Sequence, residues 1–369
     1  MTREDPGVPP NVGKLAADDS AKGKHRGVVH SLAPSPLDVN LIWAGTEDGL
    51  IWVTRDGGKN WENVTPADPT LWSKVAPLNA SHFDAGIVHT AVIRFRLDEL
   101  HPYIYRTHDG GKTGQRITDS LPDDASVNVL RQDPVRRGLL FAGTERAVWV
   151  SFNDGDSWQS LQLNLPATSI RDLVVHGDDL VVGTNGRSFW ILDDITPLRQ
   201  ITDPVVNSDT FLFKSAAAYR MRRDVNTDTP LPPEQPDGAI IDYYLQSSDV
   251  GSAKLDIFGP NGKLVRSFPS ADKPEVTMEQ LNKEPYVPTY WVRPPKILSA
   301  EAGMHRFVWD LHIPPPKSLF HEYPTAAIPH DTPRYPAELP GICVVRLAVG
   351  ETPGQAGDRK HEHLTRVKT

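Results

Sequence analysis

The chain has 369 residues, among them 34 prolines and 27 glycines, and a net charge of −8. This density of proline and glycine favours a loop-rich β protein over a helical one, and the acidic balance argues against a general nucleic-acid binder. No apolar run is long enough to span a membrane, and the single cysteine, Cys343, excludes a structural disulfide within the chain.

Residues 1–27 are polar and contain no hydrophobic stretch. They do not match a signal peptide, and their composition predicts a disordered N-terminal segment. The sequence alone therefore leaves the compartment unknown.

An eight-residue phrase of the pattern Ser/Thr-x-Asp-x-Gly-x-x-Trp occurs three times, at 54–61, 107–114 and 151–158. The acidic or amide side chain can accept bonds from its own turn, the glycine allows a positive φ, and the Trp can pack beneath the turn. We therefore expect hairpin turns in which each Trp is buried, and a structural role for the residues Thr54, Asp56, Gly58, Trp61, Thr107, Asp109, Gly111, Ser151, Asn153, Gly155 and Trp158. The middle copy has Gly114 where the others have Trp.

The residues around each phrase also repeat. A run that ends in Gly-Thr precedes an Ile-Trp-Val or Val-Trp-Val strand in the first and third units, and a fourth unit at 180–192 lacks the phrase. The copies are 53 and 44 residues apart, measured from Asp56 to Asp109 and from Asp109 to Asn153. This period suits four-stranded propeller blades. We predict an all-β fold in which residues 28–200 form a partial β-propeller of about four blades, with inner strands at 28–33 and 170–175.

A second region follows the blades. Residues 201–238 are rich in Pro, Asp and Thr and predict a linker. Strand patterns at 239–245, 253–258, 264–268, 307–311 and 342–349 predict a small immunoglobulin- or fibronectin-like sandwich over 239–350, with a Pro-rich insertion at 314–340. Residues 351–369 are expected to form a charged tail.

Four phrases, at 42–49, 102–107, 171–180 and 186–194, together resemble the sortilin-like (VPS10-like) class of YVTN/BNR Asp-box repeat proteins, which are often labelled glycosyl hydrolases. The resemblance continues into the sandwich and covers most of the chain. It implies an exported protein, and the chain looks like the C-terminal part of a longer member. A ring with missing blades leaves sheet surfaces uncovered, so we expect self-association or a partner chain that supplies blades.

Few residues point to chemistry. A glycosidase needs two carboxylates that flank the scissile bond, and the best acidic candidates are Asp193 and Asp194, which lie close in sequence to the candidate ligand-binding residues Arg187 and Trp190. No spacing of His, Cys and acidic residues matches a metal site, and no cofactor motif is present.

The leading hypothesis from the sequence is a binding or scaffold module for a protein, peptide or glycan. The alternative is a glycoside hydrolase of sialidase or xyloglucanase type, or an inactive fragment of one.

Overall fold

The computed structural model describes residues 1–9, 22–25, 27–67, 71–219, 236, 238–248, 251–273, 277, 279, 283, 297–314 and 336–350, together with the backbone of 359–368. The chain divides into two compact units, Met1–Leu192 and Asp193–Thr369, and each is described by itself. Regular structure is almost entirely β-strand in mostly antiparallel sheets, so the predicted all-β class is confirmed. In the described ranges, no helix has the length and apolar character needed to cross a membrane.

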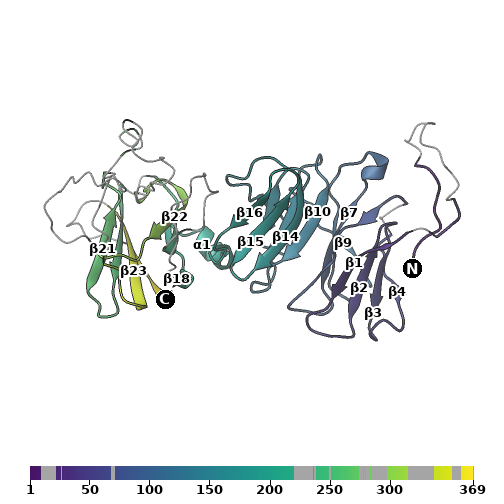
Figure 1. Ribbon diagram of the computed structural model, residues 1–369, viewed down its shortest axis with the longest axis horizontal. Helices are drawn as coiled ribbons and strands as arrows, with labels where there is room; N and C mark the ends of the chain where they lie inside the picture. The colour runs from purple at the N-terminus through teal and green to yellow at the C-terminus, as the bar shows by residue number, and fades with distance from the viewer. Residues whose placement is uncertain are drawn as a thin grey trace, which may run out of the picture. The chain divides into compact units, whose positions relative to one another are not determined.

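The first unit consists of four successive small sheets, which we call blades 1 to 4 (Figure 1). Their strands lie side by side in chain order, as in propeller blades. Blade 1 is β1 (Val29–Pro34), β2 (Ile42–Thr46), β3 (Ile51–Thr54) and β4 (Glu62–Asn63); blade 2 is β5 (Lys74–Val75) with β6 (Asn79–Ala80), β7 (Val88–Ile93), β8 (Ile104–Thr107) and β9 (Gln115–Arg116); blade 3 is β10 (Val127–Gln132), β11 (Leu140–Thr144), β12 (Val148–Ser151) and β13 (Gln159–Ser160); blade 4 is β14 (Ile170–His176), β15 (Asp179–Thr184) and β16 (Phe189–Leu192).

Neighbouring blades pack through apolar cores. Trp43 and Val53 of blade 1 share a buried cluster with Val75 of blade 2. Ile104 of blade 2 lies in a second cluster with Leu130 of blade 3, as do other buried residues of both blades. Residues of the first three strands of a blade therefore contribute to these interfaces, and β1 and β14 open their blades as the sequence predicted.

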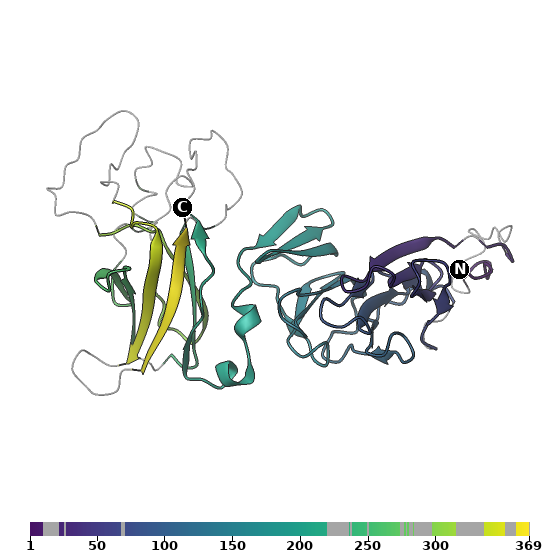
Figure 2. The ribbon, with the colours of Figure 1, turned by 90° about the horizontal axis from the view of Figure 1, so that it is seen from below.

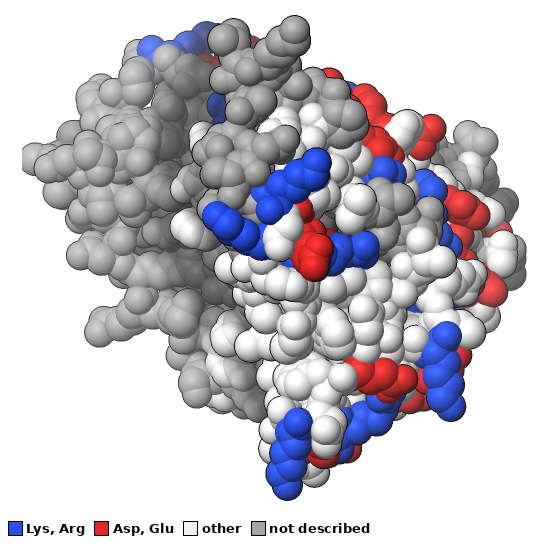
Figure 3. All heavy atoms as spheres, turned by 90° about the vertical axis from the view of Figure 1, so that its right-hand side faces the viewer, with Lys and Arg blue, Asp and Glu red and all other residues white. Residues whose placement is uncertain are grey.

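Blade 1 packs one face on blade 2, and among the described residues no other blade covers its opposite face. Along β1, Ser31 and Ala33 are buried, whereas Leu32 between them is exposed. Figure 3 looks at the first unit from the end where blade 1 lies: uncharged atoms fill the middle of this face and charged side chains gather around it.

The second unit is a two-sheet sandwich. One sheet has the order β17 (Thr210–Leu212), β19 (Ala239–Leu245), β22 (Gly303–Trp309); the other has the order β18 (Ala218–Tyr219), β24 (Arg359–Lys368), β23 (Gly341–Gly350), β20 (Ser252–Phe258), β21 (Leu264–Pro269). Figure 2 shows β23 and β24 side by side in yellow. Ile241 and Trp309 of the first sheet share a buried core with Leu255 and Val345 of the second.

Three segments differ from the expectations. The 3-10 helix η4 (Leu198–Gln200) lies just before the segment predicted as a linker, and that segment itself carries α1 (Asp203–Val206) and β17, because its short apolar run pairs Phe211 with Tyr244 of β19. The expected charged tail forms β24, which pairs along its length with β23. Within the segment predicted to be disordered, Glu4 forms a β-bridge with His25, while residues 10–21 and 26 lie outside the described residues. Most of the Pro-rich insertion, 315–335, also lies outside them.

Candidate functional site

The repeated phrases form the turns between the third and fourth strands of blades 1 to 3. In the first, Asp56 accepts hydrogen bonds from the backbone N–H groups of Lys59 and Asn60, each at 2.9 Å. Thr54 Oγ1 donates to Asp56 at 2.8 Å and accepts from the Gly58 N–H at 2.9 Å. The bonds from Asn60, followed by that from Thr54, lower the pKa of the Asp56 carboxyl to about 2.

The other two turns repeat this geometry. The backbone N–H and hydroxyl of Thr113 hold Asp109 in the same way and lower the pKa of its carboxyl to about 2. In the third turn the neutral amide of Asn153 accepts the Ser157 N–H at 3.0 Å. Because the amide of Asn153 accepts the same backbone hydrogen bond as the carboxylates of Asp56 and Asp109, the role of these three side chains is to form the turn.

The second and third turns also pack against the preceding blade. A Cβ added to Gly111 would lie 2.8 Å from Cβ of Val64 in blade 1, and one added to Gly155 would lie 2.4 Å from Cδ1 of Ile117 in blade 2. The Trp158 indole donates to the Ile117 carbonyl at 2.9 Å and is buried. The glycine in these two phrases thus permits close approach of blades as well as a positive φ, whereas a Cβ added to Gly58 would meet no atom within 4 Å.

Two departures in the phrases follow from this contact. Gly114 replaces Trp in blade 2 because Pro66 of blade 1 occupies the space: a Cβ there would lie 2.8 Å from Pro66 Cγ. Trp61 was expected to be buried but is only half-buried, and its indole bonds within its own turn to the Gly58 carbonyl at 3.1 Å. No described blade precedes blade 1, so nothing in the described part of the chain covers Trp61 as Ile117 covers Trp158.

A cluster of charged side chains joins blades 2 and 3 at the same end. The Asp154 carboxylate lies 3.0 Å from His89 Nε2, 2.9 Å from His108 Nε2 and 3.1 Å from Arg106 Nη1. Arg106 is almost fully buried and also pairs with Asp156 at 3.0 Å. Burial by itself raises the pKa of Asp154, but the hydrogen bonds from both histidines and the charge of Arg106 outweigh it, and the net pKa is lowered.

The sequence analysis did not single out this cluster, although it contained a signal. Asp154 stands where the other two phrases have Gly57 and Gly110, and like them it has a positive φ, 61° against 73° and 72°. A non-glycine residue in the left-handed region is unusual and indicates a specific role for its side chain. Here that role is to hold two blades together.

The turns between the second and third strands lie at the end of the blades opposite the repeated phrases, because the third strand runs from one set of turns to the other. In blades 1, 3 and 4 these turns begin with Gly-Thr, and the next residue donates its N–H to the carbonyl that precedes the inner strand, as in Glu47 to Val28 and Glu145 to Ser126. The side chain of Glu47 pairs with Arg96 of blade 2, and that of Glu145 with Arg171 of blade 4. Charged pairs therefore link the blades at this end.

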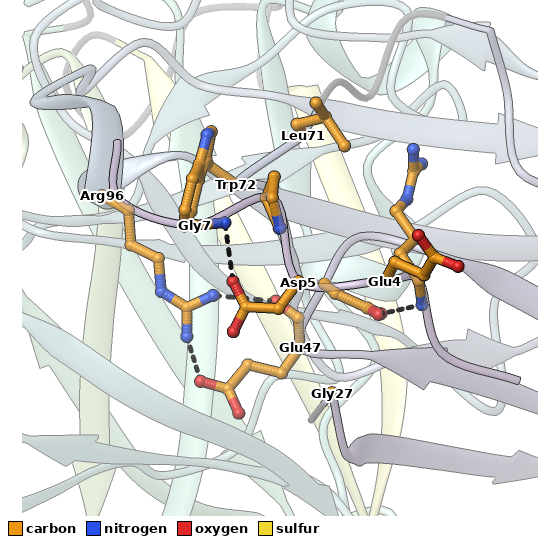
Figure 4. Close-up of a pocket in the computed structure, with 11 residues that line it drawn as sticks. Glu4, Asp5, Gly7, Gly27, Glu47, Leu71, Trp72 and Arg96 are labelled. Carbon is orange, nitrogen blue, oxygen red and sulfur yellow. Dashed lines mark hydrogen bonds and ion pairs between the residues drawn. The ribbon is translucent and has the colours of Figure 1, made fainter. Parts of the chain in front are cut away.

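A pocket of about 270 Å³ lies at this end, beside blade 1 (Figure 4). In blade 2 the corresponding turn is longer and carries the 3-10 helix η3 (Phe95–Leu97), which brings Arg96 to the pocket. In the view of Figure 4, Leu71 and Trp72 lie above Asp5 and Glu47 lies below it. The lining residues are Arg3, Glu4, Asp5, Pro6, Gly7, Gly27, Glu47, Asp48, Leu71, Trp72 and Arg96.

Hydrogen bonds fix the polar wall of the pocket. Asp48 accepts from the Arg3 N–H and from the Thr46 hydroxyl, and Asp5 accepts the Gly7 N–H at 2.9 Å. Trp72 has a φ of 73°, a strained value for a bulky residue. Such strain is often found at ligand sites, so this pocket is the candidate site of the first unit.

The residues named from the sequence as candidate site residues lie in both units. Arg187 and Trp190 belong to blade 4, where the Trp190 indole donates to the Arg187 carbonyl at 2.8 Å. Asp193 and Asp194 open the second unit; the Asp194 carboxylate accepts the backbone N–H and the hydroxyl of Thr196 at 3.0 and 2.6 Å. None of these residues lines the pocket of Figure 4. Within the described residues, no group of three or more His, Cys, Asp or Glu side chains is arranged to hold a metal ion.

Comparison with known proteins gives similarity to solved structures only. A scan against models of protein families finds no match, and a search of curated proteins finds none either. Similar solved structures include YCF48 from Cyanidioschyzon merolae (20% identity, 46% of this chain and 54% of that chain, TM-score 0.36) and YCF48 bound to D1 peptide (16%, 64% and 68%, 0.36). A third is the GH74 xyloglucanase from Xanthomonas campestris (15%, 68% and 39%, TM-score 0.37).

These structures are β-propeller proteins, and this chain spans about half the length of the first of them. Because all three TM-scores lie below 0.5, the description of the blades rests on the strands of this chain. The resemblance to sortilin-like repeat proteins stays a prediction.

Proposed function

We propose that the first unit is a binding module and that its ligand is a peptide whose cationic group enters the pocket beside Trp72. The observation that carries the proposal is the charge of the pocket lining. The lining contains four acidic residues, Glu4, Asp5, Glu47 and Asp48, and two basic ones, Arg3 and Arg96. The excess of negative charge favours an ammonium or guanidinium group.

The apolar wall suits the rest of such a ligand. Trp72 and Leu71 offer a surface on which the aliphatic stem of a Lys or Arg side chain can pack, and the indole face attracts a cation. A neutral glycan could stack on Trp72 but would gain nothing from the excess of carboxylates. The pocket therefore favours a basic side chain or the amino terminus of a peptide.

Calorimetric titration of the full chain tests this proposal. We expect saturable binding of a short peptide with Lys or Arg near its amino terminus, and loss of binding when its amines are acetylated. Trp72→Ala and Glu47→Gln should each weaken binding by about tenfold, the effect of roughly 1.4 kcal/mol.

Glu145→Gln is the matched control, because Glu145 holds the same place in the turn of blade 3 but does not line the pocket. Equal binding of the acetylated peptide would contradict the proposal. Binding of a neutral oligosaccharide that depends on Trp72 would favour a glycan ligand, and turnover of that oligosaccharide would favour the glycoside hydrolase.

A further inference from the structure

The outer edge of β16 lacks a neighbouring strand among the described residues. In blades 1 to 3 a two-residue fourth strand covers this edge, whereas blade 4 has only the order β14-β15-β16. On one face of the blade, the β16 side chains Phe189 and Ile191 are 79% and 58% exposed. Exposed strand edges are normally blunted with charges or proline; β16 has neither, so its edge is suited to pairing with a further strand.

The complete blades show how an added strand would bond. The residue after each fourth strand, Val64, Ile117 or Leu161, donates its N–H to the first residue of the third strand at 2.9 Å. Phe189 pairs with Gly183 as Val148 pairs with Gly143, so the Phe189 carbonyl is the corresponding acceptor in blade 4. Because alternate residues of a strand point their backbone groups to the same side, the N–H of Ile191 faces the same edge.

A crevice beside the edge of β16 indicates which side chain an added strand would carry. It has a volume of about 50 Å³ and lies between blades 3 and 4, where Leu161, Leu163, Trp190 and Leu192 are among its lining residues. Leu161 holds the place in blade 3 that Ile117 holds in blade 2. Between blades 2 and 3 the indole of Trp158, the last residue of the repeated phrase, lies against Ile117. Blade 4 lacks the phrase, and so it has no Trp at the corresponding position to lie against Leu161.

The interface between blades 1 and 2 supports this interpretation. There the phrase has Gly114 in place of Trp, and a smaller crevice of about 30 Å³ is lined by Gly114 and Val64. Crevices thus occur at both interfaces where the turn lacks its Trp. An aromatic residue just before the added strand would lie over the crevice beside β16.

We propose that β16 binds an extended peptide of the pattern aromatic-polar-polar-aliphatic, which adds to blade 4 as an antiparallel fourth strand. Its aliphatic residue donates an N–H to the Phe189 carbonyl, and its aromatic residue covers the crevice. Trp158-Gln159-Ser160-Leu161 of blade 3 has this pattern. A second copy of β16 does not, because Phe189, Trp190 and Ile191 include no polar pair. This site is separate from the pocket of blades 1 and 2.

Fluorescence anisotropy with a labelled peptide of residues 156–163, Asp-Ser-Trp-Gln-Ser-Leu-Gln-Leu, tests the proposal on the full chain. We expect saturable binding and at least a tenfold loss when the peptide is N-methylated at the Leu that corresponds to Leu161. Ile191→Pro should cause a similar loss, because it removes an outward N–H, and proline is tolerated at such edge positions. Ile191→Thr keeps the N–H and should stay within about threefold of the unmodified chain.

The methylated peptide tests the backbone bond on the unmodified protein, so the result does not depend on whether the proline variant folds. Equal binding of the methylated and unmethylated peptides would overturn the proposal, as would no binding at millimolar peptide. Dimerisation that Ile191→Pro abolishes would show that a second copy occupies the edge, which also overturns it. Trp72→Ala should leave this binding unchanged, which separates it from binding at the pocket.

Discussion

Leu32 and Leu130 hold the same position in the inner strands of blades 1 and 3, but Leu130 is fully buried and Leu32 is 63% exposed. Leu32 pairs with Ala44, and Leu130 with Ala142, the corresponding residue of its second strand. Blade 2 covers Leu130, whereas no described blade covers Leu32. The open face of blade 1 therefore has the side chains of an interface between blades.

Leu130→Ala should lower the free energy of unfolding by about 2–5 kcal/mol, the range for a large-to-small change in a core. Leu32→Ala should change it by less than about 0.5 kcal/mol, because an exposed side chain loses little on truncation. Urea unfolding of the two variants measures both values. An equal loss for Leu32→Ala, with a midpoint that rises with protein concentration, would show that self-association covers this face.

The two Trp residues of the repeated phrases should also differ. Trp158→Ala removes a buried indole and its bond to Ile117, so it should destabilise the chain by about 3–5 kcal/mol. Trp61 is half-buried and its indole bonds within its own turn, to the Gly58 carbonyl, so Trp61→Ala should cost about 1 kcal/mol. Thermal melting with a surface variant as reference measures the difference, and equal losses would contradict the contact with the preceding blade.

Acid should weaken the first two turns but not the third. The folded pKa of Asp56 and Asp109, about 2, lies below the ordinary carboxyl value of about 3.9. A carboxyl whose pKa is lower in the folded than in the unfolded state stabilises the folded state. This contribution is complete above the pKa of the unfolded state and is lost as the pH falls through the pKa of the folded state. The unmodified chain should therefore lose stability from about pH 4 to pH 2.

The variant with both Asp56→Asn and Asp109→Asn should lose less over that range, because the amide of Asn153 already forms the same turn without a titrating group. Denaturant midpoints at several pH values compare the two proteins. Parallel pH curves would show that other carboxyls account for the acid sensitivity.

The strands were predictable where their signal is local. The Gly-Thr turns and the repeated phrases mark strand ends within a few residues, and the predicted strand at 239–245 coincides with β19. The strand β24 was missed because a charged segment shows no pattern of its own and is held by its pairing with β23. The candidate site was missed for a similar reason: Arg3, Glu47 and Arg96 come from three distant segments, and only the packed blades bring them together.

We predict no hydrolysis of sialosides, xyloglucan or aryl glycosides by this chain. Asp194 is buried and held by Thr196, and Arg306 donates to the backbone carbonyls of both Asp193 and Asp194. These contacts suit a turn, whereas a glycosidase needs two carboxylates that flank the substrate at about 5–10 Å. Turnover that is lost in Asp194→Asn but kept in Asp56→Asn would favour the enzyme.

The bonds between Asp154 and blade 2 should make a large contribution to stability. Asp154→Gly restores the residue type of the other two phrases and keeps the positive φ, but it leaves the buried Arg106 without its Asp154 partner and His89 without its acceptor. Breaking a partly buried pair on one side should cost about 2–4 kcal/mol.

Asp156→Asn is the control, because Asp156 is mostly exposed and its pair with Arg106 should contribute less than about 1 kcal/mol. Urea unfolding of both variants measures the two contributions. A third variant, His89→Gln, can keep a donor to Asp154 and should fall between them. If Asp154→Gly were as stable as the unmodified chain, the relief of strain at this φ would equal the value of the bonds, and the cluster would not hold the blades together.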